Sequence, residues 1–129
     1  MNSLERILHV DDDADILQVT KLALEEIGGF VVEICSSGRE AIDKAPIFAP
    51  DLILLDVMML GMDGPETLRR LLKLPGMAET PVVFMTAKSQ GREIERYKAM
   101  GAVDIVTKPF DPMTLSQHIR DIWQSYRAM

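Results

Sequence analysis

The most constraining feature of this sequence is an aliphatic run that ends in a single carboxylate. Residues 52–55 read Leu-Ile-Leu-Leu, Asp56 follows directly, and Pro50 and Gly61 bound the segment. An uninterrupted apolar run of this length predicts a β-strand buried on both faces, as in a parallel sheet covered by helices. Open α/β sheets place their chemistry at the carboxyl ends of such strands. Because a buried carboxylate is costly without a partner, we expect other side chains to converge on Asp56.

The composition is that of one soluble globular domain. The chain has 129 residues, 47% of them hydrophobic, and its net charge of −6 argues against a nucleic-acid surface. No apolar run approaches the ~20 residues that a membrane span needs, and no secretory signal is visible. A single cysteine, Cys35, excludes an internal disulfide and suits a reducing compartment. We therefore expect a cytoplasmic protein with one domain over residues 1–129, without membrane or nucleic-acid contact.

Strand-like and helix-like segments alternate along the whole chain. Short apolar runs predict strands at residues 6–10, 30–35, 52–56, 81–85 and 103–106. Apolar stripes with helical spacing predict a helix after each strand, and the second of these helices is expected to run from Ser37 to Ala45, before Pro46. Five such alternations imply an α/β fold with a doubly wound, five-stranded parallel sheet and five helices. The count fits the flavodoxin-like strand order 2-1-3-4-5.

This strand order brings polar side chains together at one edge of the sheet. They follow the first, third, fourth and fifth strands: Asp11, Asp12 and Asp13, then Asp56, then Thr86, then Thr107 and Lys108. Two carboxylates about 4 Å apart repel by about 4 kcal/mol at an effective dielectric constant of about 20, so three of them either raise a pKa or recruit a cation. Because all the ligands on offer are oxygens, the cation is expected to be Mg²⁺. A carboxylate, a divalent ion, a lysine and a hydroxyl are the parts of a phosphoryl-transfer site.

Four motifs, in this order, resemble the receiver domains of two-component response regulators, those of chemotaxis regulators among them. The motifs are Val10-Asp11-Asp12, the Asp56 strand with Gly61-Met62-Asp63-Gly64, Met85-Thr86-Ala87, and Lys108-Pro109-Phe110. The resemblance covers essentially the whole chain. It implies a phosphorelay module that takes a phosphoryl group from a sensor histidine kinase or a histidine phosphotransfer protein. Such a module then controls a downstream protein target or an output domain, in some cases by dimerising, and catalyses only its own phosphorylation and dephosphorylation.

The same resemblance implies a role for each residue of the site. Asp56 would be the phospho-acceptor and would share Mg²⁺ with Asp12, which binds the ion directly, and with Asp11, which acts through water. The backbone carbonyl of Met58 would be the remaining protein ligand. Lys108 would pair with the phosphoryl group.

The resemblance also assigns residues at the ends of the fourth and fifth strands. Thr86 would bond the phosphoryl group as a conformational switch, next to the small Ala87, and the Lys108–Pro109 peptide bond would be cis. Two positions depart from the family's pattern. Ile105 stands where an aromatic switch residue is usual, and Leu60 stands where proline is common, so we expect a looser loop after Asp56.

A second interpretation is a haloacid-dehalogenase-like phosphatase. Asp11 and Asp13 have the D-x-D spacing of that family, in which the first aspartate is the nucleophile and the second the general acid. Against it, Asp15 stands where threonine or valine is expected, and Asp56 would have no role. A calcium loop built on the same aspartates fails because the glycine and the glutamate that it needs are missing.

Some of these residues also have purely structural interpretations. Asp13 and Asp15 are favoured as caps of the first helix. His9, inside the first strand, is expected to be a hydrogen-bonded core histidine, and His118 is expected to be exposed. Cys35 is not favoured as a redox switch, because its nearest basic neighbour in the sequence is Arg39. Three methionines are expected to fill gaps and pack in loops rather than to form a cofactor site: Met58, Met59 and Met62.

Overall fold

A five-stranded parallel sheet forms the centre of the protein. The structure is a computed structural model that describes residues 3–87 and 90–128. The strands are β1 (Arg6–Val10), β2 (Val31–Cys35), β3 (Leu52–Asp56), β4 (Val82–Thr86) and β5 (Asp104–Thr107). Their order in the sheet is β2-β1-β3-β4-β5, and every neighbouring pair is parallel. The predicted fold class and strand order are therefore confirmed.

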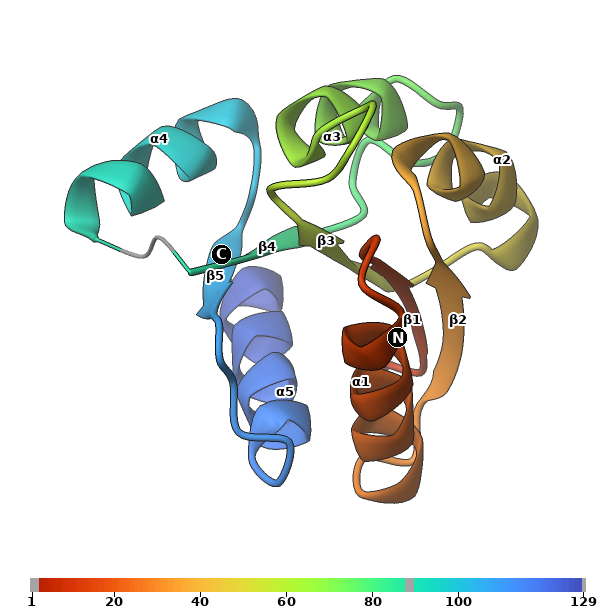
Figure 1. Cartoon of the computed structure of the whole chain (residues 1–129), viewed down its shortest axis with the longest axis vertical. Helices are drawn as coiled ribbons and strands as arrows, with labels where there is room; N and C mark the ends of the chain where they lie inside the picture. Colours follow the sequence, from red (N-terminus) through yellow and green to blue (C-terminus); the bar gives the residue numbers. More distant parts are fainter. Residues whose placement is uncertain (1–2, 88–89, 129) are drawn as a thin grey trace.

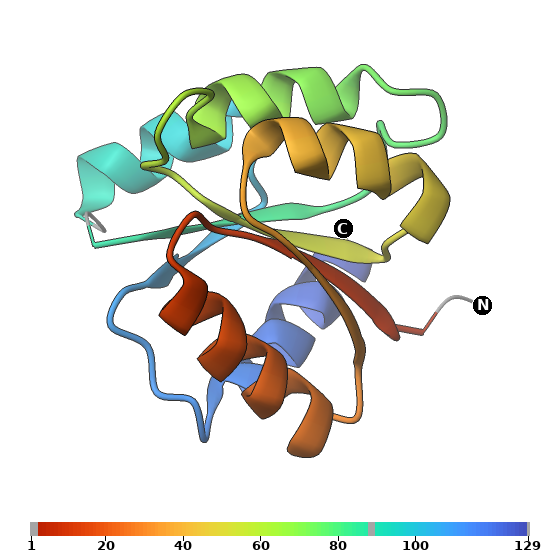
Figure 2. The same cartoon turned by 45° about the vertical axis from the view of Figure 1, so that its right-hand side comes forward.

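The helices lie in two layers, one on each face of the sheet. In the described part of the chain they are α1 (Ala14–Glu26), α2 (Gly38–Phe48), α3 (Gly64–Leu72), α4 (Gly91–Met100) and α5 (Leu115–Arg127). Figures 1 and 2 show α1 and α5 on one face, and α2, α3 and α4 on the other. Among the described residues, no helix combines the length and the apolar character that a membrane crossing requires.

Each layer of helices encloses its own apolar cluster against the sheet. Strand residues alternate between the two clusters because successive side chains point to opposite faces. In β3, Ile53 and Leu55 pack toward the α2–α3–α4 layer, whereas Leu52 and Leu54 pack toward α1 and α5. All five residues of β3 are buried. Burial on both faces explains why the sequence of β3 is continuously apolar before Asp56 and does not alternate between apolar and polar residues.

Side-chain caps fix where three of the helices begin. Asp13 accepts the N–H groups of Asp15 and Ile16 at the start of α1, so the cap is Asp13, and Asp15 lies in the first turn. Ser37 caps α2 and Asp63 caps α3 by accepting backbone N–H groups three residues further on. Each cap satisfies backbone donors that have no partner inside the helix. The first helix is therefore anchored immediately after the acidic run.

The second helix is longer than predicted. It continues through Pro46 and ends at Phe48, where Ala49 adopts a left-handed conformation with φ 54°. Proline removes one helical hydrogen bond, but the last turn is held from outside. The guanidinium of Arg6 lies 4.2 Å from the centre of the Phe48 ring, and its Nε donates to the Phe48 carbonyl. Tertiary contacts thus outweigh the local stop signal.

His9 is buried as predicted, but the expected hydrogen bonds are absent. Its side chain is 0% exposed, and neither ring nitrogen has a hydrogen-bond partner among the described residues. Its neighbours across the sheet, Ile34 and Leu54, offer only apolar side chains. Burial, together with the smaller effect of the positive charge of Lys108, lowers the pKa of His9 to about 3. The imidazole is therefore neutral at pH 7.

Two other structural predictions are confirmed. His118 is exposed on α5. Cys35 is buried at the end of β2, and burial raises the pKa of its thiol to about 12. Because the thiolate is the reactive form of cysteine, this thiol is unreactive at neutral pH.

Candidate acidic site at the carboxyl end of the sheet

Three carboxylates meet where β1 and β3 end side by side. Asp11 follows β1 and is 0% exposed, Asp56 is the last residue of β3 and is 5% exposed, and Asp12 is exposed at the rim. One oxygen from each of these three side chains lies within 4.8 Å of the others. Because β1 and β3 are neighbours in the sheet, residues that are far apart in the sequence converge here. We call Asp11, Asp12, Asp56 and the adjoining Lys108 the acidic site.

Lys108 supplies the positive charge that the acidic site needs. Its Nζ lies 2.7 Å from Asp56 Oδ1 and 2.9 Å from Asp11 Oδ2, so one ammonium bridges the two buried carboxylates. The backbone brings it there, because the Lys108 N–H donates to the Thr86 carbonyl and extends the ladder between β4 and β5. The Lys108–Pro109 bond is cis, as predicted. A hydrogen-bonded bridge of this kind compensates for taking charges out of water.

Burial and hydrogen bonding act in opposite directions on the pKa values of Asp56 and Lys108. Burial raises the pKa of Asp56 above its usual value, and the charges of Asp11 and Asp12 add to that rise, whereas the hydrogen bond from Lys108 opposes it. Burial by itself lowers the pKa of Lys108, but its bonds to Asp56 and Asp11 outweigh that effect and the pKa is raised. The lysine is therefore a firmly held cation beside a carboxylate in a crowded negative field. A further cation would relieve that crowding.

Backbone N–H groups also donate to both aspartates of the β1–α1 turn. Asp11 Oδ1 accepts the N–H of Asp13 at 2.9 Å, and Asp12 Oδ2 accepts the N–H of Leu60 at 2.9 Å. The sequence analysis missed the second bond. The sequence shows only that such a bond is possible, because any residue other than proline at position 60 carries an N–H that can donate.

The residues assigned from the fourth and fifth strands occupy different positions: Thr86 and Ala87 lie at the carboxyl end of β4, whereas Ile105 packs in an apolar cluster. Thr86 is buried at the end of β4, next to Met85, which pairs with Asp56 across the sheet. Ala87 is exposed just beyond it. Ile105 is buried in the α2–α3–α4 cluster, which also contains Phe84 and Tyr97. The phosphate-binding and switching roles of Thr86, Ala87 and Ile105 stay predictions.

The donor atoms of the acidic site suit a hard divalent cation. They are carboxylate oxygens, which Mg²⁺ prefers to nitrogen or sulfur ligands, and they lie close enough to share one ion. The carbonyl of Met58 stays a predicted ligand, two residues after Asp56. Met59 packs against the α2–α3–α4 cluster, as the gap-filling prediction expects, whereas the Met58 side chain is 69% exposed in the loop after β3 and fills no gap in the core.

The fold and the site together place this protein among the doubly wound parallel α/β domains that carry a lysine-bridged acidic cluster at the carboxyl ends of β1 and β3. Comparison with known families is consistent with that class: the model of the response regulator receiver domain matches residues 7–120. The chain therefore belongs to the receiver domain family of two-component response regulators. The phosphatase interpretation finds no support in these comparisons.

Individual relatives agree with this assignment. The transcriptional regulatory protein CseB of Streptomyces coelicolor is 34% identical over 120 residues, which are 93% of this chain and 50% of that protein. The alkaline phosphatase synthesis transcriptional regulatory protein PhoP of Bacillus subtilis is 36% identical over 118 residues, or 92% and 48%. The solved structure of the chemotaxis response regulator CheY4 of Vibrio cholerae has a TM-score of 0.86 at 31% identity and covers 93% and 99%. The chain spans about half the length of the curated relatives.

Proposed function

We propose that this receiver domain, over residues 1–129, accepts a phosphoryl group on Asp56 in a Mg²⁺-dependent reaction. The observation that carries the proposal is the Lys108 bridge, with Nζ 2.7 Å from Asp56 and 2.9 Å from Asp11. Of the two buried carboxylates, Asp56 is the one that ends a strand, β3, and it pairs there with Met85 of β4. Asp11 is held by both Lys108 and the Asp13 N–H. Asp56 is therefore the better nucleophile.

The transfer forms one bond and breaks another. A carboxylate oxygen of Asp56 attacks phosphorus, while the bond from phosphorus to the histidine nitrogen of the donor breaks and its electron pair stays on that nitrogen. Negative charge spreads over the phosphoryl oxygens in the transition state. The Lys108 ammonium, already within bonding distance of Asp56, neutralises part of that charge. The Thr86 hydroxyl is proposed to donate to a phosphoryl oxygen. The domain thus catalyses only its own phosphorylation and dephosphorylation.

Asp12 and Asp56 would hold Mg²⁺ directly, with Asp11 acting through water and the Met58 carbonyl completing the protein ligands. The convergence of Asp11, Asp12 and Asp56 supports this assignment. When bound, Mg²⁺ would supply charge neutralisation at the phosphoryl oxygens. The aspartates have the complementary task of holding the ion beside the acceptor oxygen.

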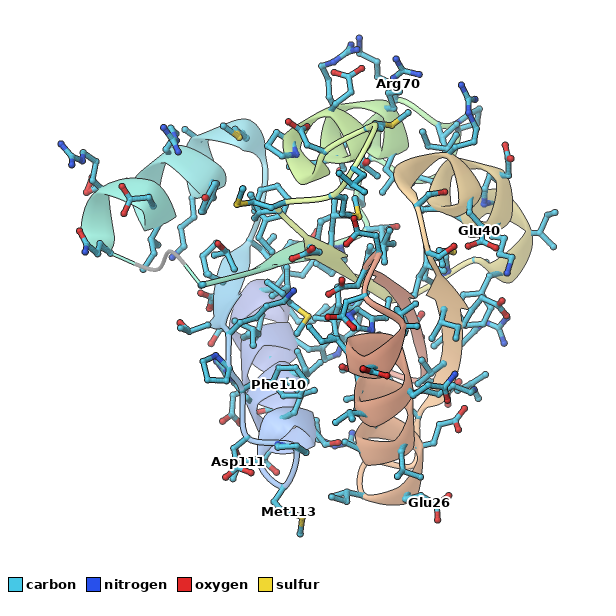
Figure 3. All side chains as sticks on the ribbon, viewed as in Figure 1. Glu26, Glu40, Arg70, Phe110, Asp111 and Met113 are labelled. Atoms are coloured by element: carbon cyan, nitrogen blue, oxygen red, sulfur yellow. The ribbon has the colours of Figure 1, made fainter. Side chains whose placement is uncertain are left out.

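The phosphoryl donor is proposed to be a sensor histidine kinase or a histidine phosphotransfer protein. An apolar groove of about 340 Å³ lies next to Lys108, and Ile16 and Val19 of α1 line it together with Phe110. Figure 3 shows Phe110, Asp111 and Met113 on the segment between β5 and α5. Apolar surface beside the acceptor supports docking of a protein rather than of a small phosphate ester.

The phosphorylated domain is proposed to act on a downstream protein target or an output domain in the cytoplasm. Thr86 and position 105 would relay the change, but with Ile105 packed among Phe84 and Tyr97 the relay has no aromatic ring to rotate at that position. Dimerisation on phosphorylation belongs to the same proposal and is tested by light scattering before and after phosphorylation. The net charge of −6 supports an output without nucleic-acid contact by this domain.

Intact-mass spectrometry after incubation with acetyl phosphate and Mg²⁺ tests the proposal. One phosphoryl adduct is expected on the wild-type protein and none on Asp56→Asn, because the amide is not a nucleophile of this kind. Asp43→Asn, at an exposed position on α2, is the matched control and should be phosphorylated normally. An adduct that persists in Asp56→Asn but disappears in Asp11→Asn would overturn the assignment of the acceptor.

A further inference from the structure

One hydrogen bond ties the loop after β3 to the acidic site. The backbone N–H of Leu60 donates to Asp12 Oδ2 at 2.9 Å, although the two residues are 48 positions apart. The Leu60 side chain is 89% exposed, so packing of that side chain contributes little to holding the loop. Leu60 therefore contributes its main-chain N–H to the acidic site.

The rest of the loop holds that donor in place. At its start the Val57 N–H donates to the Met85 carbonyl, and at its end the Gly64 N–H donates to the Val57 carbonyl at 2.8 Å. A Cβ at Gly64 would lie 2.5 Å from the Asp56 carbonyl oxygen, so the closed loop requires glycine there. The N–H of Leu60 therefore projects from a loop that is closed on itself and attached to the sheet.

We infer that the main-chain N–H of Leu60 positions the Asp12 carboxylate for a divalent cation. This inference rests on the proposed function, in which Asp12 is a direct ligand. Asp12 is exposed, and an exposed carboxylate loses rotational freedom when it binds an ion. A carboxylate has about four lone-pair directions, so one N–H leaves room for the cation. Hydrogen bonds to ligating carboxylates raise metal affinity, and their loss typically costs about 10- to 100-fold.

The departure from proline at this position is what makes the bond available. Proline has no N–H, so Leu60→Pro removes this donor, whereas Leu60→Ala keeps it and truncates only the exposed side chain. Leu60→Ala is therefore the reference for Leu60→Pro. The ratio of their Mg²⁺ dissociation constants isolates the contribution of the N–H from that of the side chain.

Isothermal titration with Mg²⁺ measures this ratio. Leu60→Pro is expected to bind Mg²⁺ about tenfold more weakly than Leu60→Ala, at the lower end of the usual range for such bonds because Asp12 is exposed. Circular dichroism of both proteins confirms that each is folded. Equal affinities, or tighter binding by Leu60→Pro, would overturn the inference.

Amide hydrogen exchange in the wild-type protein gives a second measurement that needs no folded proline variant. Because coupling between two interactions is reciprocal, a bond that favours Mg²⁺ binding must itself be strengthened by Mg²⁺. Exchange of the Leu60 amide should slow about tenfold on saturation with Mg²⁺. The Glu66 amide, which donates to Asp63 at 3.0 Å outside the acidic site, is the matched control and should not change. Unchanged or faster exchange at Leu60 contradicts the inference.

The two measurements separate this inference from the proposed function. If the wild-type protein binds Mg²⁺ and is phosphorylated on Asp56 while Leu60→Pro matches Leu60→Ala, only the role of Leu60 fails. If the wild-type protein neither binds Mg²⁺ nor gains an adduct, both fail.

Discussion

Two sets of buried polar groups lie on the same side of the sheet: the charged set is paired, and the neutral set has no hydrogen-bond partners among the described residues. In the acidic site, Asp11 and Asp56 share the Lys108 ammonium. His9 lies on β1, two residues before Asp11, and its side chain therefore points to the same face as that of Asp11. Thr20 is buried on α1. His9 Nδ1 and Nε2 and the Thr20 Oγ1 have no hydrogen-bond partner among the described residues.

The difference reflects what each group costs when it is left alone. An ionised group in a poorly solvated environment costs far more than a neutral one, so the fold had to pair the carboxylates. An imidazole can lose its proton instead, and burial lowers the pKa of His9 to about 3. An unsatisfied neutral group then costs only about 1–3 kcal/mol. Charge, rather than polarity, thus decides which buried groups must find a partner.

The largest expected effect comes from removing the shared cation. Lys108→Met leaves Asp11 and Asp56 facing each other and should lower the free energy of unfolding by about 3 kcal/mol, as breakage of buried ion pairs usually does. Urea unfolding at pH 7 measures this loss. Lys108→Arg keeps the charge and should lose less, and Mg²⁺ should restore part of the stability of Lys108→Met. If metal-free Lys108→Met were as stable as the wild type, the buried carboxylates would not need a partner, and the difference between the charged and the neutral set would not hold.

Acid should sharpen the contrast, because the two sets respond to it with opposite signs. His9 has a folded pKa of about 3 and an unfolded pKa near 6.5, so the unfolded chain takes up the proton first. Stability is therefore lost as the pH falls from about 6.5 toward 3, by about 1.4 kcal/mol per pH unit. The pKa of Asp56 is raised, so protonation of Asp56 favours the folded state as the pH falls.

A substitution at His9 isolates its share of the acid response. His9→Leu should unfold at pH 4 with a free energy about 3 kcal/mol higher than that of the wild type, beyond any difference at pH 7. Urea titrations between pH 7 and 4 follow this gap. His118→Leu, at an exposed position on α5, is the control and should follow the wild-type curve. Parallel curves for His9→Leu and the wild type would show that folding does not lower the pKa of His9.

The smallest expected effect distinguishes hydroxyls with and without a partner. Thr20→Val replaces an unpaired buried hydroxyl by a methyl group and should stabilise the protein by about 1 kcal/mol. Ser116 is also buried, but its hydroxyl donates to the Ala23 carbonyl at 3.4 Å, so Ser116→Ala should destabilise by about 0.5–1 kcal/mol. Thermal unfolding of both variants at pH 7 tests this difference in sign. Destabilisation of similar size in both would indicate that Thr20 has a partner.

The sequence predicts the strongly constrained parts of this molecule well. The run before Asp56 identifies a central strand because burial on both faces leaves no polar position, and the strand order follows from the alternation of strands and helices. The meeting of Asp11, Asp12 and Asp56 then follows from topology. Local patterns fail where distant contacts decide. Arg6 extends α2 beyond Pro46, and a main-chain N–H at Leu60 reaches Asp12, and neither contact leaves a periodic signal.

Lys108 also sets the order in which the acidic site can be completed. Its partners lie 97 and 52 residues earlier in the chain, so during synthesis both aspartates leave the ribosome well before the lysine does. A nascent chain that ends before β5 has the negative charges without their counterion. The segment from β5 to Lys108 therefore makes burial of the β1–α1 acidic turn favourable, and fragments that lack this segment should keep Asp11 and Asp56 in water.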